Sequence, residues 1–451
     1  MKTFLLSFLT FVFATSISAQ SVKVSWATTH QTMDGFGAST GYVERNPNLT
    51  PSQADCFFSA TNASCDTGNS IGLEWIRIQD SEDGTSTPDL TTLRLAVARG
   101  AKVFISFDFE YSFTSANWPS MTSYIIAKIQ YLQSNGVPVA YLSPQNEPEN
   151  NSSWTASILD QFTATSLVPG LTAAGLSIPI VLGEDSNWFR VDYVTPCMND
   201  SSCTPYVPVV AGHAYGSGSV DGFPAGGYQC CTTYVPVPSS AAGKRVWQTE
   251  VNGGFSGPCA SDSGLASYDP SMTDALVYAH NIHDFLTVAN GSAWMFWNLQ
   301  AQTAHGAPDC NDGITDSNFN PAKRFYAIGN WSKFVRSGWV RIDATASPAS
   351  RIYVTAFKEG SSGNFAIVAV NQNSSPANVN FSLSGFPSVA SVTPTLTSAS
   401  VNLVDQATAS VSSGFSYLLP ANSVITFHGV ASSTPSSSNP SAPNGLTAAV
   451  Q

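Results

Sequence analysis

Short apolar runs alternate with amphipathic segments from residue 34 to about residue 335. Eight of the runs have the length and composition of buried strands, and we predict strands at 34–39, 71–79, 101–110, 138–147, 179–185, 207–215, 245–250 and 292–299. Helices are predicted between them at 51–60 behind the N-capping Thr50, 90–99, 121–134, 156–174 and 271–288. Eight strands alternating with helices predict an α/β fold, a (β/α)8 TIM barrel. An open doubly wound sheet is the alternative, and it is disfavoured because no glycine-rich phosphate loop follows an early strand.

After residue 335 the pattern changes to strands without helices, predicted at 340–346, 351–359, 364–371, 378–383, 391–397 and 413–427. Polar and apolar residues alternate with a period of two, which is typical of half-buried strands. We therefore predict a β-sandwich side domain over residues 336–430, joined by an N-terminal strand from residues 20–33. The Ser/Pro-rich residues 431–451 are interpreted as a linker followed by the possible start of a fibronectin type III-like module.

Residues 1–19 have the pattern of a secretory signal peptide, with Lys2 before the apolar run Phe4 to Phe13 and a small residue, Ala19, at the expected cleavage site. The run is too short for a bilayer-spanning helix, which needs about 20 apolar residues. We therefore predict a secreted, extracellular protein without a membrane partner. The chain's eight cysteines suit disulfides in that setting.

The short separations favour two disulfides, Cys56 with Cys65 and Cys197 with Cys203. The remaining cysteines would then pair across the chain, so that Cys230 and Cys231 join Cys259 and Cys310.

Charge excludes one class of partner. The chain of 451 residues is 43 % hydrophobic but only 11 % charged, with 30 acidic against 18 basic residues and a formal net charge of −12. Nucleic-acid phosphates need a basic face, so no nucleic-acid partner is expected. Large apolar content with few charges is also common in secreted proteins.

Two glutamates end predicted strands 4 and 7, Glu147 and Glu250. Catalytic groups of TIM barrels collect at the carboxyl ends of the strands. Hydrolysis of a glycosidic bond needs an acid to protonate the leaving oxygen and an anion beneath the ring, and in retaining enzymes the two carboxyls lie about 5 Å apart. Strands 4 and 7 face each other across the barrel mouth, so we predict a retaining glycosidase site. For each glutamate taken singly, the alternative is a carboxylate that caps a helix or pairs with a surface lysine.

Neighbouring residues separate the two roles. Asn146 can hydrogen-bond the sugar 2-hydroxyl, which makes Glu147 the acid/base. Arg77 on strand 2 can hold Glu250 ionised as the nucleophile.

Further substrate-binding candidates lie on strands 6 and 8. His213 and Tyr215 alternate so that both can face one side, although His213 could equally be a satisfied core residue. Trp297 is the candidate sugar platform, while Trp294 is assigned to packing. Outer subsites are predicted at three loop tryptophans, Trp118, Trp154 and Trp188, for which loop packing is the alternative.

Other chemistries lack their motifs. No His/Cys/Asp cluster has metal-ligand spacing, so no metal and no cofactor are expected. A serine triad would need G-x-S-x-G at a strand-helix elbow, and Gly216-Ser217-Gly218-Ser219 does not match it.

Four motifs together resemble glycoside hydrolase family 30: Met33-Asp34-Gly35-Phe36-Gly37-Ala38-Ser39, Gln145-Asn146-Glu147-Pro148, Trp247-Gln248-Thr249-Glu250 and Ser332-Lys333-Phe334-Val335-Arg336. Asn-Glu-Pro is shared by a whole clan of barrel glycosidases, whereas the opening and closing motifs are more specific. The resemblance spans about residues 21–430. It implies a barrel with a β side domain built from both chain ends, retention of configuration, Glu147 as acid/base and Glu250 as nucleophile.

The resemblance narrows the substrate to β-linked glycans. Members dedicated to glucuronoxylan carry an arginine in the loop after strand 8, whereas this chain has residues 300–305 without arginine and the next arginine is Arg324. The loop after strand 3, residues 109–113, also lacks the tryptophan usual in relatives. We expect a monomeric endo-β-1,4-xylanase that does not strictly depend on glucuronate. The alternatives are a β-1,6-glucanase, a β-1,6-galactanase, an exo-acting β-glycosidase or a glucosylceramidase of the same family, and, from another class, a non-catalytic carbohydrate-binding protein.

Overall fold

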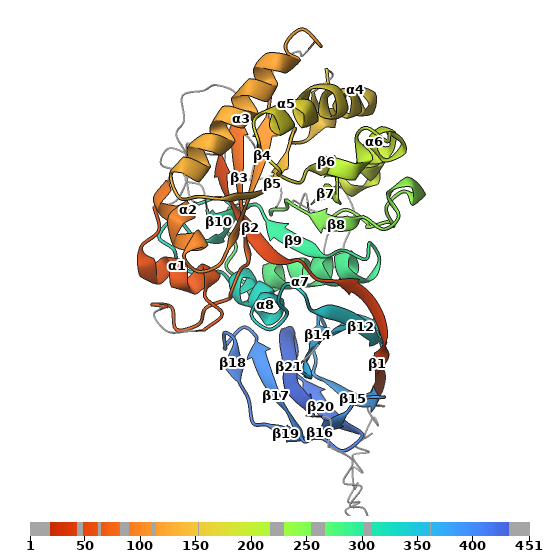
Figure 1. Ribbon diagram of the computed structural model, residues 1–451. Helices are drawn as coiled ribbons and strands as arrows, with labels where there is room; N and C mark the ends of the chain where they lie inside the picture. Colours follow the sequence, from red (N-terminus) through yellow and green to blue (C-terminus); the bar gives the residue numbers. More distant parts are fainter. Residues whose placement is uncertain are drawn as a thin grey trace, which may run out of the picture.

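The computed structural model describes residues 19–42, 48–61, 65–81, 90–109, 114–151, 153–216, 230–253, 267–301, 309–360 and 362–432. The chain forms a barrel of parallel strands ringed by helices, with a β domain packed beneath it (Figure 1). The predicted signal peptide and the C-terminal linker lie almost entirely outside the described residues. No helix in the described ranges is long and apolar enough to cross a bilayer.

All eight predicted barrel strands form. They are β2 (Gly35–Tyr42), β3 (Trp75–Ser81), β4 (Lys102–Asp108), β5 (Val139–Ser143), β6 (Val181–Asn187), β7 (Val209–Tyr215), β8 (Arg245–Gln248) and β9 (Ala293–Phe296). Their order is β5-β4-β3-β2-β9-β8-β7-β6, every pairing is parallel, and the single bridge between Leu142 and Ile180 links β5 to β6. The predicted barrel is therefore confirmed, and the open doubly wound sheet is excluded.

Two further short strands, β10 (Asn298–Gln300) and β11 (Gly313–Thr315), extend the sheet at the rim beside β2. The first overlaps the end of the strand predicted at 292–299, and the second was not predicted. Each has three residues, too few for an alternation pattern to identify it.

The opening Asp-Gly-Phe-Gly motif has a packing reason. Trp75 and Trp247 fill the barrel interior with ring centroids 4.7 Å apart. Asp34 accepts hydrogen bonds of 2.8 Å from the Trp247 indole Nε1 and 2.7 Å from the Ser292 hydroxyl. A Cβ at Gly37 would lie 2.6 Å from the Cβ of Trp75, so only glycine allows β2 to approach β3 at this point.

Helices alternate with the strands around the barrel. They are α1 (Pro51–Phe58), α2 (Leu90–Val97), α3 (Trp118–Ser134), α4 (Ala156–Phe162), α5 (Val168–Ala173), α6 (Thr195–Asn199), α7 (Met272–Thr287) and α8 (Lys323–Ser332). Thr50 caps α1 as predicted, with a reciprocal bond from Gln53. The single helix predicted over 156–174 contains a π-helical turn at Thr163–Leu167. Pro169 lacks the N–H that an α-helical ladder would use there, and the wider turn accommodates it.

Helix α8 and the short α6 were not predicted from the sequence. Nine of the ten residues of α8 are buried, from Arg324 to Ser332, because the helix lies between the barrel and the β domain (Figure 1). Its polar residues Arg324, Asn330 and Ser332 are buried together with its apolar ones, so polarity in the sequence did not indicate which positions face the core.

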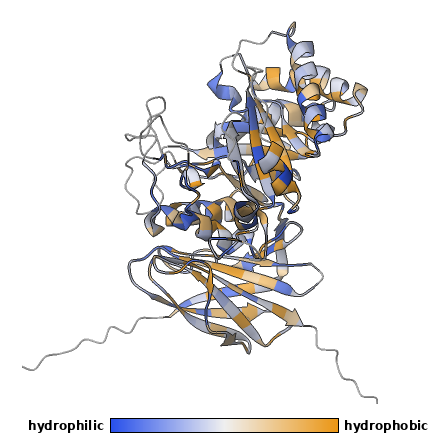
Figure 2. Ribbon diagram, turned by 90° about the vertical axis from the view of Figure 1, so that its left-hand side faces the viewer, coloured by the Kyte–Doolittle hydropathy of each residue, from blue (hydrophilic) through white to orange (hydrophobic). Residues whose placement is uncertain are grey.

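The β domain contains β1 (Gln20–Thr32), β12 (Val340–Ala344), β13 (Ile352–Lys358), β14 (Asn364–Asn371), β15 (Ala377–Ser384), β16 (Ser388–Val389), β17 (Ser391–Thr397), β18 (Val404–Asp405), β19 (Ala409–Ser410), β20 (Gly414–Leu419) and β21 (Ser423–Ser432). The N-terminal β1 lies between β12, antiparallel to it, and β15, parallel to it. Hydrophobic and hydrophilic residues intermingle along these strands in Figure 2, as period-two alternation requires. A barrel with an attached β domain is therefore confirmed.

The strand predicted at 413–427 is wrong in one respect. It is two strands, β20 and β21, that turn at residues 420–422, where Asn422 has a φ of +45°. Pro420 cannot donate a ladder hydrogen bond and asparagine tolerates a left-handed conformation, so the chain reverses there.

Disulfides Cys56–Cys65 and Cys197–Cys203 form as predicted. Cys230 and Cys231 bond to each other, so the prediction that they join Cys259 and Cys310 is wrong. That prediction assumed that adjacent cysteines serve different partners, whereas two neighbours can close a small ring of their own. Cys310 is disulfide-bonded, and Cys259 lies outside the described residues.

Candidate active site

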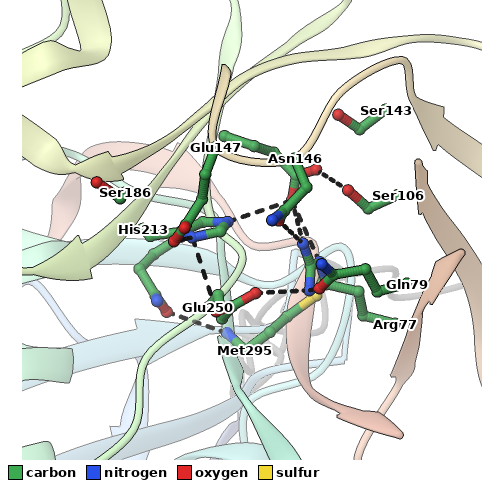
Figure 3. A network of polar contacts seen from close by, with 12 residues as sticks. Arg77, Gln79, Ser106, Ser143, Asn146, Glu147, Ser186, His213, Glu250 and Met295 are labelled. Carbon is green, nitrogen blue, oxygen red and sulfur yellow. Dashed lines mark hydrogen bonds and ion pairs between the residues drawn. The ribbon is translucent and has the colours of Figure 1, made fainter. Parts of the chain in front are cut away.

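The strand-ending glutamates meet at the carboxyl-terminal rim of the barrel. Glu147 follows β5, Glu250 follows β8, and His213 lies on β7 between them. One carboxylate oxygen of each glutamate and one ring nitrogen of His213 all lie within 4.8 Å of one another. Figure 3 shows the three side chains converging, with Arg77 and Asn146 beside them. The topology thus brings together residues that are about a hundred positions apart in the sequence.

Glu147 is held on an unusual backbone turn. Its φ is +40° and its ψ is 58°, a left-handed conformation that costs free energy for a non-glycine residue. Its N–H donates to the carbonyl of Glu184 at 3.1 Å, and its Oε2 accepts from Nδ2 of Asn150 at 2.7 Å. The turn therefore directs the Glu147 carboxylate toward His213 instead of along the strand.

Arg77 is the central cation of the site. It is fully buried on β3, and its Nη1 lies 2.8 Å from Oε2 of Glu250, so the predicted ion pair is present. Its Nη2 donates to Oδ1 of Asn146 at 2.7 Å, and its Nε donates to Oε1 of Glu184 at 3.2 Å. The guanidinium fork thereby fixes the relative positions of groups from three strands.

Glu184, in the middle of β6, was missed by the sequence reasoning. It is fully buried, accepts a short hydrogen bond from the Ser106 hydroxyl, and lies 3.6 Å from Nε2 of His213. Burial alone would raise the pKa of Glu184, but Arg77, His213 and Ser106 lower it to about 2. A glutamate following the apolar residues 180–182 in a predicted buried strand was the signal that could have identified it.

The depressed pKa of Glu184 predicts a specific loss of stability in acid. Its pKa falls from 4.5 to about 2 on folding, so its charge stabilises the fold above pH 4.5 and this contribution disappears as the pH falls through about 2. We expect Glu184→Gln to lower the free energy of unfolding at pH 7 by about 3 kcal/mol, and the difference from wild type to shrink between pH 4.5 and 2. Urea unfolding across this range measures it. Asp343→Asn, at an exposed position, is the control, and a pH-independent difference for Glu184→Gln would contradict the linkage.

His213 and Tyr215 face the same side of β7, as predicted. The His213 Nδ1 lies 2.9 Å from Oε1 of Glu147 and 3.9 Å from Oε1 of Glu250, and the Tyr215 hydroxyl donates to Oε1 of Glu250 at 2.8 Å. Burial alone would lower the pKa of His213, but Glu250, Glu147 and Glu184 raise it to about 10. The ring is therefore an imidazolium at neutral pH, not a neutral core histidine.

The pKa of Glu250 lies above its ordinary value, as the balance of opposing effects. Burial and the neighbouring Glu147 raise it, while His213, Arg77 and the Tyr215 hydroxyl lower it. Three carboxylates, Glu147, Glu184 and Glu250, face two cations, so the buried cluster is electrically neutral when it holds one further proton. Glu184 is kept ionised by its low pKa.

Glu147, His213 and Glu250 are close enough together to ligate a metal ion, but their chemistry does not fit one. Arg77 already occupies an oxygen of Glu250, and a protonated His213 has no lone pair to offer.

A second layer of amides supports the site from β3 to β5. Gln79 donates to Oδ2 of Asp108 at 2.8 Å, and Gln145 donates to Oδ1 of the same carboxylate at 3.3 Å. Arg77 in turn donates to Oε1 of Gln79 at 3.4 Å. This layer links the Gln145-Asn146-Glu147 segment to β4, and no sequence spacing indicated it.

The structure agrees with some of the tryptophan predictions and contradicts others. Trp297 is largely buried, and the guanidinium carbon of Arg77 lies 5.6 Å from its ring centroid, so it borders the site. Trp294 packs in the core with its Nε1 donating to Asn281 at 2.8 Å, as expected. Trp154 and Trp188 are fully buried in the same core, so their assignment to outer subsites is wrong, because their loops fold back onto the helices. Trp118 also packs inward, with its ring centroid 6.0 Å from that of Phe162.

Two loops that the sequence predicts to influence substrate choice are only partly described. Residues 110–113 after β4 and 302–308 after β10 lie outside the described residues. Arg324, the nearest downstream arginine, is fully buried and forms an ion pair with Asp274. It is therefore not positioned to bind a substrate carboxylate.

Comparison with known proteins places this geometry in context. No family model matches the chain. It is 28 % identical over 430 residues to the glucuronoxylanase XynC of Bacillus subtilis strain 168, covering 91 % of this chain and 92 % of XynC. Its fold is similar to that of the glycoside hydrolase family 30 subfamily 8 xylanase Xyn30A of Clostridium acetobutylicum, with a TM-score of 0.71, 24 % identity, and coverage of 91 % of this chain and 100 % of Xyn30A.

The catalytic domain of the GH30 xylanase C of Talaromyces cellulolyticus is equally similar in fold, with a TM-score of 0.71 and 19 % identity, covering 91 % of this chain and 100 % of that domain. The similarity to XynC extends through both the barrel and the β domain, and the structures with the same two-part fold include family 30 enzymes. Together with the four motifs, these findings indicate that the chain is a glycoside hydrolase, and its similarity is to enzymes of glycoside hydrolase family 30.

Proposed function

We propose that this chain is a secreted, retaining endo-β-xylanase in which Glu147 is the acid/base and Glu250 the nucleophile. The observation that carries the proposal is the approach of the two carboxylates, whose oxygens lie within 4.8 Å in a buried cluster that is neutral with one proton. Retaining glycosidases need about 5 to 5.5 Å between these groups, whereas inverting enzymes need room for a water molecule between them. The similarity to a glucuronoxylanase over nearly the whole chain supports xylan as the substrate.

The neighbours support this division of roles. Arg77 forms its ion pair with Glu250, which favours the anion that attacks C1 of the sugar. As the acid, Glu147 gives a proton to the leaving oxygen. When the glycosyl-enzyme ester has formed, Glu147 is the base that activates the water which opens it. His213 contacts Glu147 directly and supplies the positive charge beside it throughout.

Asn146 is oriented for the sugar 2-hydroxyl. Arginine only donates hydrogen bonds, so the atom of Asn146 that faces Nη2 of Arg77 is its carbonyl oxygen. The amide nitrogen is thereby directed away as a donor. A donor at the 2-hydroxyl strengthens its bond as charge develops at C1, which stabilises the transition state. Tyr215 and Trp297 complete the proposed substrate-binding set.

Strict dependence on glucuronate is not expected. Residues 300–305 contain no arginine, and Arg324 is buried with Asp274. We propose that the enzyme acts as a monomer on xylan with or without uronate substituents. The apolar N-terminal segment and the disulfides Cys56–Cys65 and Cys197–Cys203 support secretion.

The decisive experiment is product analysis on a substrate panel. We expect reducing ends to be released from both glucuronoxylan and arabinoxylan at rates within about tenfold of each other, and the first products to have the β configuration in a proton NMR time course. Glu250→Gln is the matched inactive control. Initial products with the α configuration would contradict retention, and release of reducing ends from a β-1,6-glucan alone would contradict xylan as the substrate. If no β-glycan gave release above the control, the remaining interpretation would be a carbohydrate-binding protein.

A further inference from the structure

The vicinal disulfide Cys230–Cys231 lies directly behind the active site. Tyr215, whose hydroxyl donates to Glu250, is the last residue of β7 and forms an antiparallel bridge with Cys230. The next contact continues this pairing, since the N–H of Thr232 donates to the carbonyl of Ala214 at 2.9 Å. The segment that contains the disulfide is therefore the backbone support of Tyr215.

The support is closely packed. Gly216 lies so near to this segment that a Cβ on it would be 3.0 Å from the Cα of Thr232. The Thr232 hydroxyl donates to Asn187 at the end of β6, at 3.0 Å. Both cysteines are buried, at 2 % and 3 % exposure, within the main hydrophobic core. A displacement of this segment would therefore be transmitted to Tyr215.

The placement of the disulfide indicates a local effect. Residues 231–238 form no regular strand or helix, so no extended ladder holds this stretch. A disulfide stabilises the folded state more when it closes a longer loop, and a bond between neighbours closes the smallest loop possible. Cys56–Cys65 spans nine positions and constrains the unfolded chain far more. The bond between adjacent residues restricts instead the backbone of the two residues that carry it.

We propose that the Cys230–Cys231 disulfide is a positioning element that holds the Tyr215 hydroxyl on Glu250. This inference rests on the proposed role of Glu250 as nucleophile. Both sulfurs are buried in the core, so the disulfide acts through Tyr215 and not on the substrate.

The consequence of losing the disulfide follows from the contact of Tyr215. Its hydrogen bond lowers the pKa of Glu250, so a loosened Tyr215 lets that pKa rise. The acidic limb of the kcat/KM profile reports the ionisation of the nucleophile and should move to higher pH. Because the outer substrate contacts are unchanged, kcat should fall while KM stays nearly constant.

The test compares two double variants with wild type. For Cys230→Ser with Cys231→Ser we expect kcat on xylan to fall about tenfold, KM to change by less than about twofold, and the acidic limb to rise by about half a pH unit or more. Cys56→Ser with Cys65→Ser is the matched control, removing a disulfide far from the site. It should lower the melting temperature more, and leave kcat and the acidic limb of the folded enzyme unchanged.

A mutant cycle with Tyr215→Phe separates positioning from general damage. If the disulfide acts through the hydroxyl, Tyr215→Phe alone should reproduce the loss in kcat and the limb shift, and adding the two serines should have little further effect. Additive losses, or a serine variant with the wild-type kcat and pH profile, would overturn the inference. A wild-type enzyme that hydrolyses no β-glycan would instead overturn the proposed function, so the two failures are distinguishable.

Discussion

Replacing Glu250 by alanine is expected to lower kcat at least about 10⁴-fold, because no glycosyl-enzyme ester can form without the attacking carboxylate. The vacated space lies beside Arg77, His213 and Tyr215, all of which contact Glu250 in the wild type. A small anion such as azide can occupy this space and attack C1 directly. Activity on an aryl β-xyloside should therefore recover in azide, with an α-glycosyl azide as product, since a single displacement inverts the configuration.

Glu147→Ala is the matched variant that distinguishes the two roles. It retains Glu250, so a substrate with an activated leaving group can still form the ester, and azide then replaces water in the second step. Two displacements give a β-glycosyl azide. The configuration of the azide product, measured by NMR, thus assigns each glutamate. A β azide from Glu250→Ala, or an α azide from Glu147→Ala, would exchange the proposed roles.

Replacing Arg77 by methionine should affect both stability and catalysis. The variant leaves Glu184 and Glu250 buried without the guanidinium that contacts them at 3.2 and 2.8 Å. Breaking a buried ion pair from one side costs about 3–5 kcal/mol, so we expect a loss of this size in the free energy of unfolding. Arg77 also lowers the pKa of Glu250, and its removal should shift the acidic limb of kcat/KM to higher pH.

Arg324 provides the control for this prediction. It is equally buried and also pairs with a carboxylate, Asp274, but it makes no contact with Glu147, Glu184 or Glu250. Arg324→Met should destabilise the protein by a similar amount in urea unfolding, while the acidic limb of the folded enzyme stays in place. If both variants shifted the acidic limb of the kcat/KM profile equally, the shift would reflect lost stability alone and not an effect of Arg77 on the pKa of Glu250.

Several features could be predicted from the sequence because they depend on short-range patterns, namely the periodicity of strands and the residues at strand ends. Strand periodicity located the eight barrel strands, and the switch to strands without helices located the β domain. The two glutamates were recognised because each ends a strand with distinctive neighbours. Their assignment as acid/base and nucleophile stays a prediction until the azide products are identified.

Other features depended on packing that a linear pattern does not record. Trp154 and Trp188 follow barrel strands in the sequence, as residues of a substrate subsite would, yet both are buried in the core. Helix α8 was missed because it is covered on every side, and the pairing of Cys230 with Cys231 was missed because spacing alone leaves alternatives open.

The sequence by itself therefore determined the order of elements and the two carboxylates at the barrel rim, because hydrophobic periodicity and strand ends are local properties. Only the tertiary structure decided what surrounds them. Arg77 meets Glu184 across 107 positions and Glu250 across 173. The charge state of the site depends on these distances and on burial, and both exist only once the barrel has closed.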